Sequence, residues 1–590
     1  MDRAIGVMTC PYSAIVPWRK ACSISPAAAA GGAHQGGTGA GTRRQRAHDH
    51  RLSAAAPPSC SVLLASVCNT LDALIDRLID PPELRPSVHP GRVLSGNFAP
   101  TDELPPTRCP VVRGSIPSSL AGGAYVRNGP NPRHRLPGRT HHLFDGDGML
   151  HSLLLPSPPS PTTSPSSLSE PVLCSRYVQT YKYLLERETG TPVFPNFFAG
   201  FHGVAGLARA AVMLGRVLAG QIKLKHGFGV ANTSVVFFAE CLYALCESDI
   251  PYSVFISPST GEVTTLGRCD FDGRLAIAMT AHPKKDPITG ELFAFRYSIL
   301  QPFITYFWFD AAGNKCADVP IFSSEQPSVL HDFAITEHYT IFVESQLVVK
   351  PSSGSLVGFD PAKVPRIGVL PRYARDDSEM RWFDVPGFNM LHTTNAWEEA
   401  AGDEVVLVAP SHLSLEHMAV GDMELLESRV YMVRVNIRTG AVSRAAVSPE
   451  SLEYGVVHHG YVGRRSRYGY FGVNGPMPKI SGIRKLDFDM AGTGTGTGDD
   501  GGDCTIARHD FGPRCFAGEA FFVPSNDGDE DDGYLVCYVH DEGTGESRFV
   551  VLDARSPKLD VVAEVQLPGR VPYGFHGMFV TQAELLVQQQ

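Results

Sequence analysis

Apolar residues follow two different periods along this chain, and the change comes near residue 93. Residues 61–80 carry valine and leucine at helical spacing and end at a pair of prolines. From residue 93 onward, short runs of Val, Phe, Tyr and Leu are interrupted by Gly, Pro and Asp, which is typical of strands and turns. We therefore expect an N-terminal amphipathic helix and linker over residues 57–92, and one β-domain over residues 93–590.

A Thr-Gly pair recurs between the strand-like runs, at residues 260–261, 289–290, 439–440 and 544–545. Glycine readily adopts the positive φ that tight hairpin turns require. Repeated hairpins over so long a stretch favour a β-propeller over a sandwich, which would be shorter. The repeat is irregular, so the pattern alone gives no number of blades.

Residues 204–225 show a second helical pattern. Leu207, Leu214 and Leu218 fall on one face, while Arg209 and Arg216 fall on another. The arginines exclude a helix that spans a membrane, because such a helix needs about 18 or more apolar residues in a row. An apolar face with a cationic flank is typical of a helix lying in a membrane interface. A helix packed on the core of the β-domain fits the pattern equally well.

Composition narrows the class of protein. Apolar residues make up 43% of the chain and charged residues 19%, which is ordinary for a globular protein with a large core. The net charge of −10 and the absence of a basic stripe argue against nucleic acid as a partner. Thirteen cysteines occur without a C-x-x-C pair, which indicates reduced, buried thiols.

The first residues differ from the rest of the chain. Residues 1–56 hold seven basic and two acidic side chains among many Ala, Gly and Ser residues, with no periodic apolar pattern. An acid-poor segment that carries Arg and Ser is typical of an organelle transit peptide. A disordered tail without a targeting role is the alternative.

Four histidines stand in separate and distinctive segments: His282, His331, His392 and His576. Neutral imidazole binds Zn, Cu, Fe and Ni. The four are far apart in sequence and have no ligating cysteine nearby, so they do not form a local zinc finger. They indicate instead a metal held on the axis of a closed fold.

These four segments, with GGAYVRNGPNP (residues 122–132) and HLFDGDGMLH (residues 142–151), resemble the carotenoid cleavage oxygenases over residues 93–580. The resemblance implies an all-β fold, a seven-bladed β-propeller with a few helices capping the active-site face. Within the family, GPMPKISGIRKLDF (residues 475–488) is most similar to the plant plastid type-4 carotenoid cleavage dioxygenases. Relatives that cleave epoxycarotenoids usually carry an EPWPK-like string there.

The resemblance also implies a cofactor and its ligands. Fe(2+) would be bound by the four histidines, which would make them the catalytic residues. Zinc would bind four imidazoles as readily but has no redox chemistry, so the choice of iron rests on the resemblance. Three glutamates, Glu247, Glu453 and Glu519, match positions that stand behind the last three histidines and fix their orientation.

Apolar neighbours of these residues are candidates for the wall of a substrate tunnel. Leu391 and Phe575 directly precede two of the histidines, and Tyr454 directly follows Glu453.

The aspartates of HLFDGDGMLH could be misread as a metal loop. A glycine after each aspartate and the lack of an EF-hand continuation favour a structural turn.

The resemblance implies a plastid dioxygenase that cleaves a conjugated double bond of a carotenoid with O2. By similarity to type 4, the expected bond is 9,10 or 9′,10′, giving an ionone-type fragment and an apocarotenal. The alternatives are a 9-cis-epoxycarotenoid 11,12-dioxygenase of abscisic acid synthesis, an isomerase, and a carotenoid-binding propeller without turnover. The resemblance also favours the interfacial helix, in peripheral contact with a plastid membrane or plastoglobule.

Overall fold

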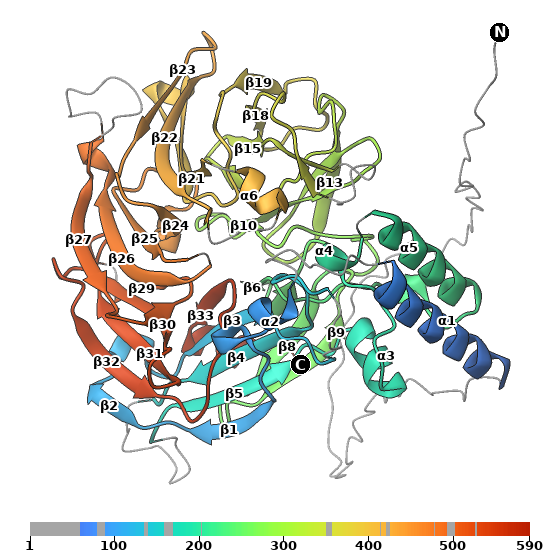
Figure 1. Ribbon diagram of the computed structural model, residues 1–590. Coiled ribbons are helices and arrows are strands. Elements are labelled where there is room, and N and C mark those ends of the chain that lie inside the picture. The colour runs from blue at the N-terminus through green and yellow to red at the C-terminus, as the bar shows by residue number, and fades with distance from the viewer. Residues whose placement is uncertain are drawn as a thin grey trace, which may run out of the picture. The chain divides into compact units, whose positions relative to one another are not determined.

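Antiparallel sheets dominate the computed structural model, and the strands of most sheets follow one another along the chain (Figure 1). The structure describes residues 59–79, 89–134, 140–157, 169–201, 203–349, 357–413, 415–420, 425–476, 478–491, 502–525 and 528–589. All of these belong to one unit of the chain, Pro57–Gln590. The predicted transit peptide, residues 1–56, lies outside the described residues.

Four sheets each have four strands in chain order. The first has β6 (Ser234–Phe238), β7 (Cys241–Leu245), β8 (Tyr252–Ile256) and β9 (Val263–Arg268). The second has β10 (Lys284–Lys285), β11 (Leu292–Tyr297), β12 (Ile304–Phe309) and β13 (Lys315–Ile321). The third has β14 (Phe333–Ile335), β15 (Tyr339–Glu344), β18 (Arg366–Pro371) and β19 (Arg381–Asp384), and the pair β16 (Leu347–Val349) and β17 (Val357–Phe359) lies outside it. The fourth has β20 (Asn395–Glu399), β21 (Glu404–His412), β22 (Ser428–Asn436) and β23 (Val442–Ala446).

A fifth sheet joins strands from both ends of the domain. Its order is β1-β5-β4-β3-β33, and β33 pairs with β3 so that Arg127 lies opposite Gly577 and Ala124 opposite Val580. The bounds are β1 (Leu104–Arg108), β3 (Ala124–Pro130), β4 (Gly148–Leu154), β5 (Val172–Tyr177) and β33 (Gly577–Val580). This sheet brings the chain's last strand beside one of its earliest.

The remaining strands form one ten-stranded sheet that contains two groups. One group is β24 (Leu452–Val456), β25 (Tyr468–Asn474), β26 (Ile480–Asp487) and β27 (Thr505–Asp510). The other is β28 (Cys515–Ala517), β29 (Phe521–Pro524), β30 (Gly533–Asp541), β31 (Glu546–Asp553), β32 (Val561–Gln566) and β2 (Val111–Gly114). With each group taken as a blade, the described part of the chain has seven blades, and the predicted all-β propeller is confirmed.

The four Thr-Gly pairs are hairpin turns, as predicted. Gly261, Gly290, Gly440 and Gly545 connect consecutive strands with φ of +73°, +71°, +79° and +78°. The core lies between neighbouring sheets. β4 and β12 are buried along their whole length, so apolar residues do not alternate with exposed polar ones. The one histidine of β4, His151, is hydrogen-bonded to Ser175 at 2.8 Å.

The helices are α1 (Ser59–Leu78), α2 (Pro90–Val93), α3 (Tyr181–Thr189), α4 (Phe197–Gly200), α5 (Gly203–Leu218), α6 (Leu415–Val420) and α7 (Gln582–Val587). Helices α1 and α5 lie side by side (Figure 1). The predicted helix over residues 204–225 is shorter than expected, because Gly220 adopts a φ of +72° just after its end. No helix among the described residues is long and apolar enough to span a membrane.

The two arginines of α5 face α1 rather than solvent. Arg209 Nη2 lies 2.8 Å from Oδ1 of Asp76, and Arg216 Nη2 lies 2.8 Å from Oδ2 of Asp72, so the helices run antiparallel. Arg216 is only 1% exposed. The expected cationic flank is therefore wrong for these arginines, because the carboxylates of α1 neutralise them. The leucine face of α5 is open, with Leu218 81% exposed.

Candidate metal centre

Each of the four histidines lies within three residues of the start of a strand. His282 precedes β10, His331 precedes β14, His392 precedes β20 and His576 precedes β33. These strands all lie at one edge of their sheets. The sheets are arranged around a common centre with these edge strands innermost (Figure 1). Residues at the start of each edge strand therefore lie close together, and the four histidine rings meet there.

The four rings form the group of potential metal ligands that stands out among the described residues, with their ligand nitrogens within 4.8 Å of one another. The Nε2 atoms of His282 and His331 are 3.0 Å apart, and the ring centroids of His392 and His576 are 5.0 Å apart. His392 Nε2 is buried and has no hydrogen-bond partner among the described residues. A cation of imidazole-binding type would satisfy these converging lone pairs, so the site fits the metal that the sequence implies.

A carboxylate lies behind three of the rings, on the Nδ1 side. The pairs are Glu247 with His331, Glu453 with His392 at 2.9 Å, and Glu519 with His576 at 3.1 Å. The three glutamates are those that the family resemblance places behind the last three histidines. A carboxylate accepts a hydrogen bond, so each of these rings carries its proton on Nδ1 and keeps the Nε2 lone pair for a metal.

Burial and neighbouring groups shift the pKa values of His282, His392 and His331. Burial and the three neighbouring imidazoles lower the pKa of His282 far below its usual range. Burial also lowers the pKa of His392, although Glu453 opposes the shift. For His331, burial lowers the pKa, but the charge and hydrogen bond of Glu247 outweigh it and the net shift is upward. Neutral rings are the form that binds a metal, and His282 and His392 are held in that form.

Strand β24 is irregular where it reaches the site. Tyr454 has a φ of +53°, which is unusual for a residue with a large side chain, and the pairing with β25 shifts register here. In a regular strand, neighbouring side chains point to opposite faces. The irregularity lets both Glu453 and Tyr454 face His392, whose ring centroid is 5.4 Å from that of Tyr454. Gly455 allows this bend, since a Cβ there would lie 2.2 Å from Oγ1 of Thr394.

Of the three predicted tunnel residues, Tyr454 is placed directly against the histidine rings, with its own ring 5.8 Å from that of His576. Phe575 is half-buried and packs edge-on against Phe144 at 5.2 Å, and Phe144 in turn packs against Phe198 of α4 at 5.4 Å. Leu391 is half-buried beside the third histidine. Aromatic side chains thus extend from His576 toward α4, where Phe198 is 40% exposed.

The aspartates of HLFDGDGMLH form a structural turn, as predicted. Asp145 accepts hydrogen bonds from the backbone N–H groups of Phe198 and Ala199, at 3.0 and 2.9 Å. Asp147 pairs with Lys182 at 2.9 Å. Both carboxylates therefore have internal partners.

Two residues near the site were not identified from the sequence. Tyr297, the last residue of β11, donates a hydrogen bond of 2.5 Å to Glu247 Oε2. His412, the last residue of β21, lies 3.6 Å from Glu453 Oε1 through its Nε2. Neither stands in a recognisable motif, and each reaches its carboxylate only through the packing of distant strands.

Comparisons with known proteins agree with this site. The family model described as retinal pigment epithelial membrane protein, RPE65, matches residues 97–581. The chain is 65% identical to "9-cis-epoxycarotenoid dioxygenase NCED2, chloroplastic" of Oryza sativa, over 100% of both chains. It is 51% identical to "Probable carotenoid cleavage dioxygenase 4, chloroplastic" of Arabidopsis thaliana, over 89% of this chain and 86% of the relative.

Solved structures show the same fold. Lignostilbene dioxygenase of Pseudomonas brassicacearum superposes with a TM-score of 0.69 at 22% identity, over 85% of this chain and 100% of that one. The cobalt-substituted ACO of Synechocystis superposes with a TM-score of 0.63 at 25% identity, over 81% of this chain and 96% of that one. The family match and the full-length relatives together show that this chain belongs to the RPE65 family of carotenoid oxygenases.

Proposed function

We propose that the four histidines bind Fe(2+) and that the protein cleaves a carotenoid with O2. The observation that carries this proposal is the convergence of four imidazole nitrogens, three of them backed by carboxylates. Iron bound there would supply the redox chemistry that lets O2 react with a conjugated double bond. Zinc in the same place would not.

The chain's own residues would orient the ligands and shape the space around them. Glu247, Glu453 and Glu519 would hold the proton of each ring on Nδ1 and partly offset the charge of the metal. Tyr454 and Phe575 would line the space beside the rings with apolar surface, which suits a polyene and excludes water. The contacts described above support these roles.

The bond that we propose is the 11,12 double bond of a 9-cis-epoxycarotenoid. This choice is supported by the two rice relatives named 9-cis-epoxycarotenoid dioxygenases, each 65% identical. The second candidate is the 9,10 or 9′,10′ bond expected from the string at residues 475–488. It is supported by the 51% identical relative named as a probable carotenoid cleavage dioxygenase 4.

The carbonyl groups of the products distinguish the two bonds. Carotenoid C9 carries a methyl group, so cleavage at 9,10 gives a methyl ketone and an aldehyde. Cleavage at 11,12 gives two aldehydes. Iron-loaded protein should be incubated with a 9-cis-epoxycarotenoid and, separately, with an all-trans bicyclic carotenoid, and the products identified by mass. We expect two aldehydes from the first substrate. Ketone products would establish the second candidate, and an absence of products would overturn the proposed activity.

We also propose that the protein works in a plastid, in the stroma or associated with thylakoids or plastoglobules. The rice and Arabidopsis relatives are named as chloroplastic, and residues 1–56 have the composition of a transit peptide. A carotenoid is almost insoluble in water, so a lipid surface would be its source. The open leucine face of α5 is the surface that we propose for peripheral contact with lipid. Helix α1 also exposes Leu71, Leu74 and Leu78.

Changing Leu207, Leu214 and Leu218 together to serine should release the mature protein from liposomes or lipid droplets. Each leucine moved from water into lipid contributes roughly 1.5–3 kcal/mol, so binding should weaken on the order of 100-fold or more. Flotation of the protein with vesicles measures this directly. The side chains are 73%, 58% and 81% exposed, so the change should leave the fold intact.

A matched control changes three similarly exposed residues at turns of the β-domain to serine: Ile277, Ile288 and Leu300, which are 74%, 73% and 74% exposed. This control should bind vesicles like the wild type. If the two triple variants float equally well, α5 is not the lipid surface. If the α5 variant unfolds, its leucines belong to the core and the interfacial role is wrong.

A further inference from the structure

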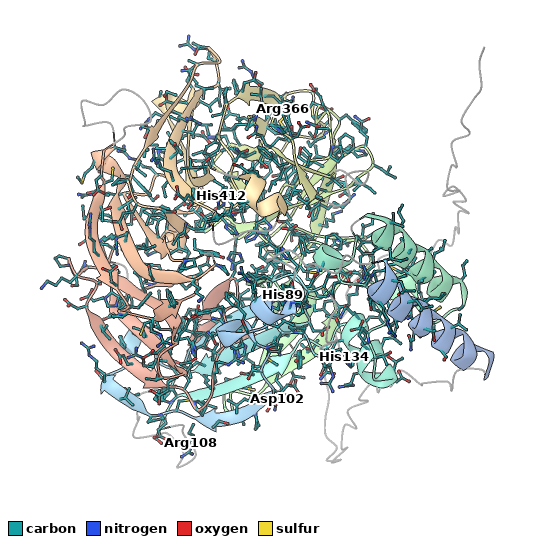
Figure 2. All side chains as sticks on the ribbon, viewed as in Figure 1. His89, Asp102, Arg108, His134, Arg366 and His412 are labelled. Atoms are coloured by element: carbon teal, nitrogen blue, oxygen red, sulfur yellow. The ribbon has the colours of Figure 1, made fainter. Side chains whose placement is uncertain are left out.

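A buried histidine lies behind the carboxylate that orients His392. His412 is fully buried inside the described domain (Figure 2). Neither of its ring nitrogens has a hydrogen-bond partner among the described residues. Its closest charged neighbour is Glu453, with 3.6 Å between Nε2 and Oε1, just beyond hydrogen-bond distance. The Oε2 atom of Glu453 also has no hydrogen-bond partner in the described part of the chain.

Polar groups buried without partners are costly, about 1–3 kcal/mol each. The Oε1 atom of Glu453 accepts a hydrogen bond from His392, and a carboxylate oxygen can accept a second one. A small movement would bring Nε2 of His412, which has no partner among the described residues, within hydrogen-bond distance of that oxygen. As the neutral tautomer with its proton on Nε2, His412 would donate to Glu453. We therefore interpret His412 and Glu453 as a hydrogen-bonded pair rather than as two unsatisfied polar groups.

The backbone ties His412 to the segment that carries the metal ligand. Its N–H donates to the carbonyl of Asn389 at 2.8 Å, and Met390 forms an isolated β-bridge with Ser411. Glu453 comes from β24, in the next blade along the chain. Two imidazoles of the preceding blade, those of His392 and His412, thus approach the same oxygen of its carboxylate, Oε1.

The other two carboxylates are also held from behind. Tyr297 donates to Oε2 of Glu247 at 2.5 Å, and the N–H of Gly577 donates to Oε2 of Glu519 at 3.4 Å. Glu453 likewise needs a second donor besides His392, and His412 is the residue placed to provide it. We propose that His412 is a positioning residue that holds Glu453, and through it fixes the orientation of His392 toward the metal. The proposal rests on the proposed role of the four histidines.

The test compares His412→Leu, which keeps bulk without a donor, with His412→Gln, whose amide can still donate to the carboxylate. Tyr470→Phe is the matched control, because Tyr470 Oη is another buried polar atom without a partner in the described residues. Binding of Co²⁺ is measured by competition with a chelator, and the visible absorption of bound Co²⁺ reports its coordination. The thermal unfolding midpoint is measured on the metal-free proteins.

We expect His412→Leu to bind Co²⁺ on the order of ten-fold more weakly, with an altered spectrum, because loss of an outer partner loosens the ligand. His412→Gln should recover most of the affinity, and Tyr470→Phe should match the wild type. The metal-free unfolding midpoints should be alike. Wild-type affinity in His412→Leu would overturn the proposal. So would equal losses in the Leu and Gln variants, or losses that follow a lowered midpoint. A wild-type protein that binds no Co²⁺ would instead overturn the metal site itself.

Discussion

Replacing His331 by alanine should remove both bound iron and carotenoid cleavage. Three imidazoles would remain, and Glu247 would lose the ring that it contacts. Its carboxylate would keep the hydrogen bond from Tyr297 but would no longer orient a ligand. Because a metal site depends on the number and geometry of its ligands, we expect iron content and product formation below detection. Metal analysis of the purified variant and product analysis with a carotenoid measure the two effects.

His338→Ala is the matched control for this experiment. His338 lies in the same blade, but its side chain is 69% exposed and pairs with Glu398. Without the His338 ring, Glu398 keeps the hydrogen bonds from Thr336 Oγ1 and from the backbone N–H of residue 338, so iron content and activity should be unchanged. Full iron occupancy in His331→Ala would show that this residue is not a ligand. A metal-free but still active variant would show that the metal is not required.

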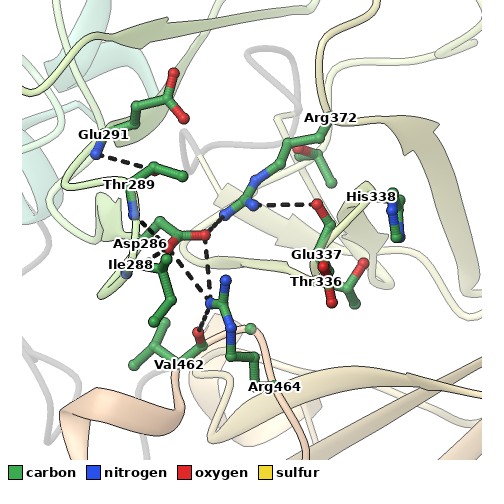
Figure 3. A network of polar contacts seen from close by, with 12 residues as sticks. Asp286, Ile288, Thr289, Glu291, Thr336, Glu337, His338, Arg372, Val462 and Arg464 are labelled. Carbon is green, nitrogen blue, oxygen red and sulfur yellow. Dashed lines mark hydrogen bonds and ion pairs between the residues drawn. The ribbon is translucent and has the colours of Figure 1, made fainter.

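Replacing Arg372 by methionine should cause the largest loss of stability. Asp286, at 0% exposure, accepts a 2.5 Å bond from Arg372, and Arg464 approaches the same carboxylate at 3.4 Å (Figure 3). Arg372 also donates to the carbonyl of Glu337, so it joins the hairpin after β10 to the strands of the next blade. Removing one partner of a buried ion pair typically costs about 3–5 kcal/mol, because the remaining charge stays buried. Chemical denaturation measures the change in unfolding free energy.

A double variant separates the cost of the orphaned charge from the loss of packing. Combining Arg372→Met with Asp286→Asn removes both charges, and the amide oxygen can still accept from Ile288 and Thr289 as the carboxylate does. The double variant should therefore be more stable than Arg372→Met alone. Arg465→Met, which breaks an exposed pair with Asp489, should stay within about 1 kcal/mol of the wild type. If Arg372→Met lowers the unfolding free energy no more than Arg465→Met does, the prediction is contradicted.

The sequence predicted those parts of the structure that depend on local signals or on long motifs. The Thr-Gly turns could be predicted because positive φ is a property of one residue, and Gly261 and Gly545 behave as expected. The four histidines could be identified because each stands in a distinctive segment. The number of blades could not be derived from the irregular repeat and came only through the family resemblance.

Features that depend on distant partners could not be predicted. The pattern of α5 showed an arginine face, but nothing in it showed that Asp72 and Asp76 would cover that face. Tyr454 was identified as a neighbour of the site, but not its positive φ, because a tyrosine carries no local preference for that conformation. His412 stands at the end of an ordinary strand and approaches Glu453 only through the packing of two blades.

The pairing of β33 with β3 determines when the fourth histidine joins the metal site. His576 precedes β33, so the fourth nitrogen arrives only when the end of the domain returns to its beginning. Until β33 pairs with β3, the site holds no more than three of the four imidazoles, a donor set that zinc accepts in its catalytic sites. The four-histidine site therefore depends on closure of the domain as well as on the presence of its ligands.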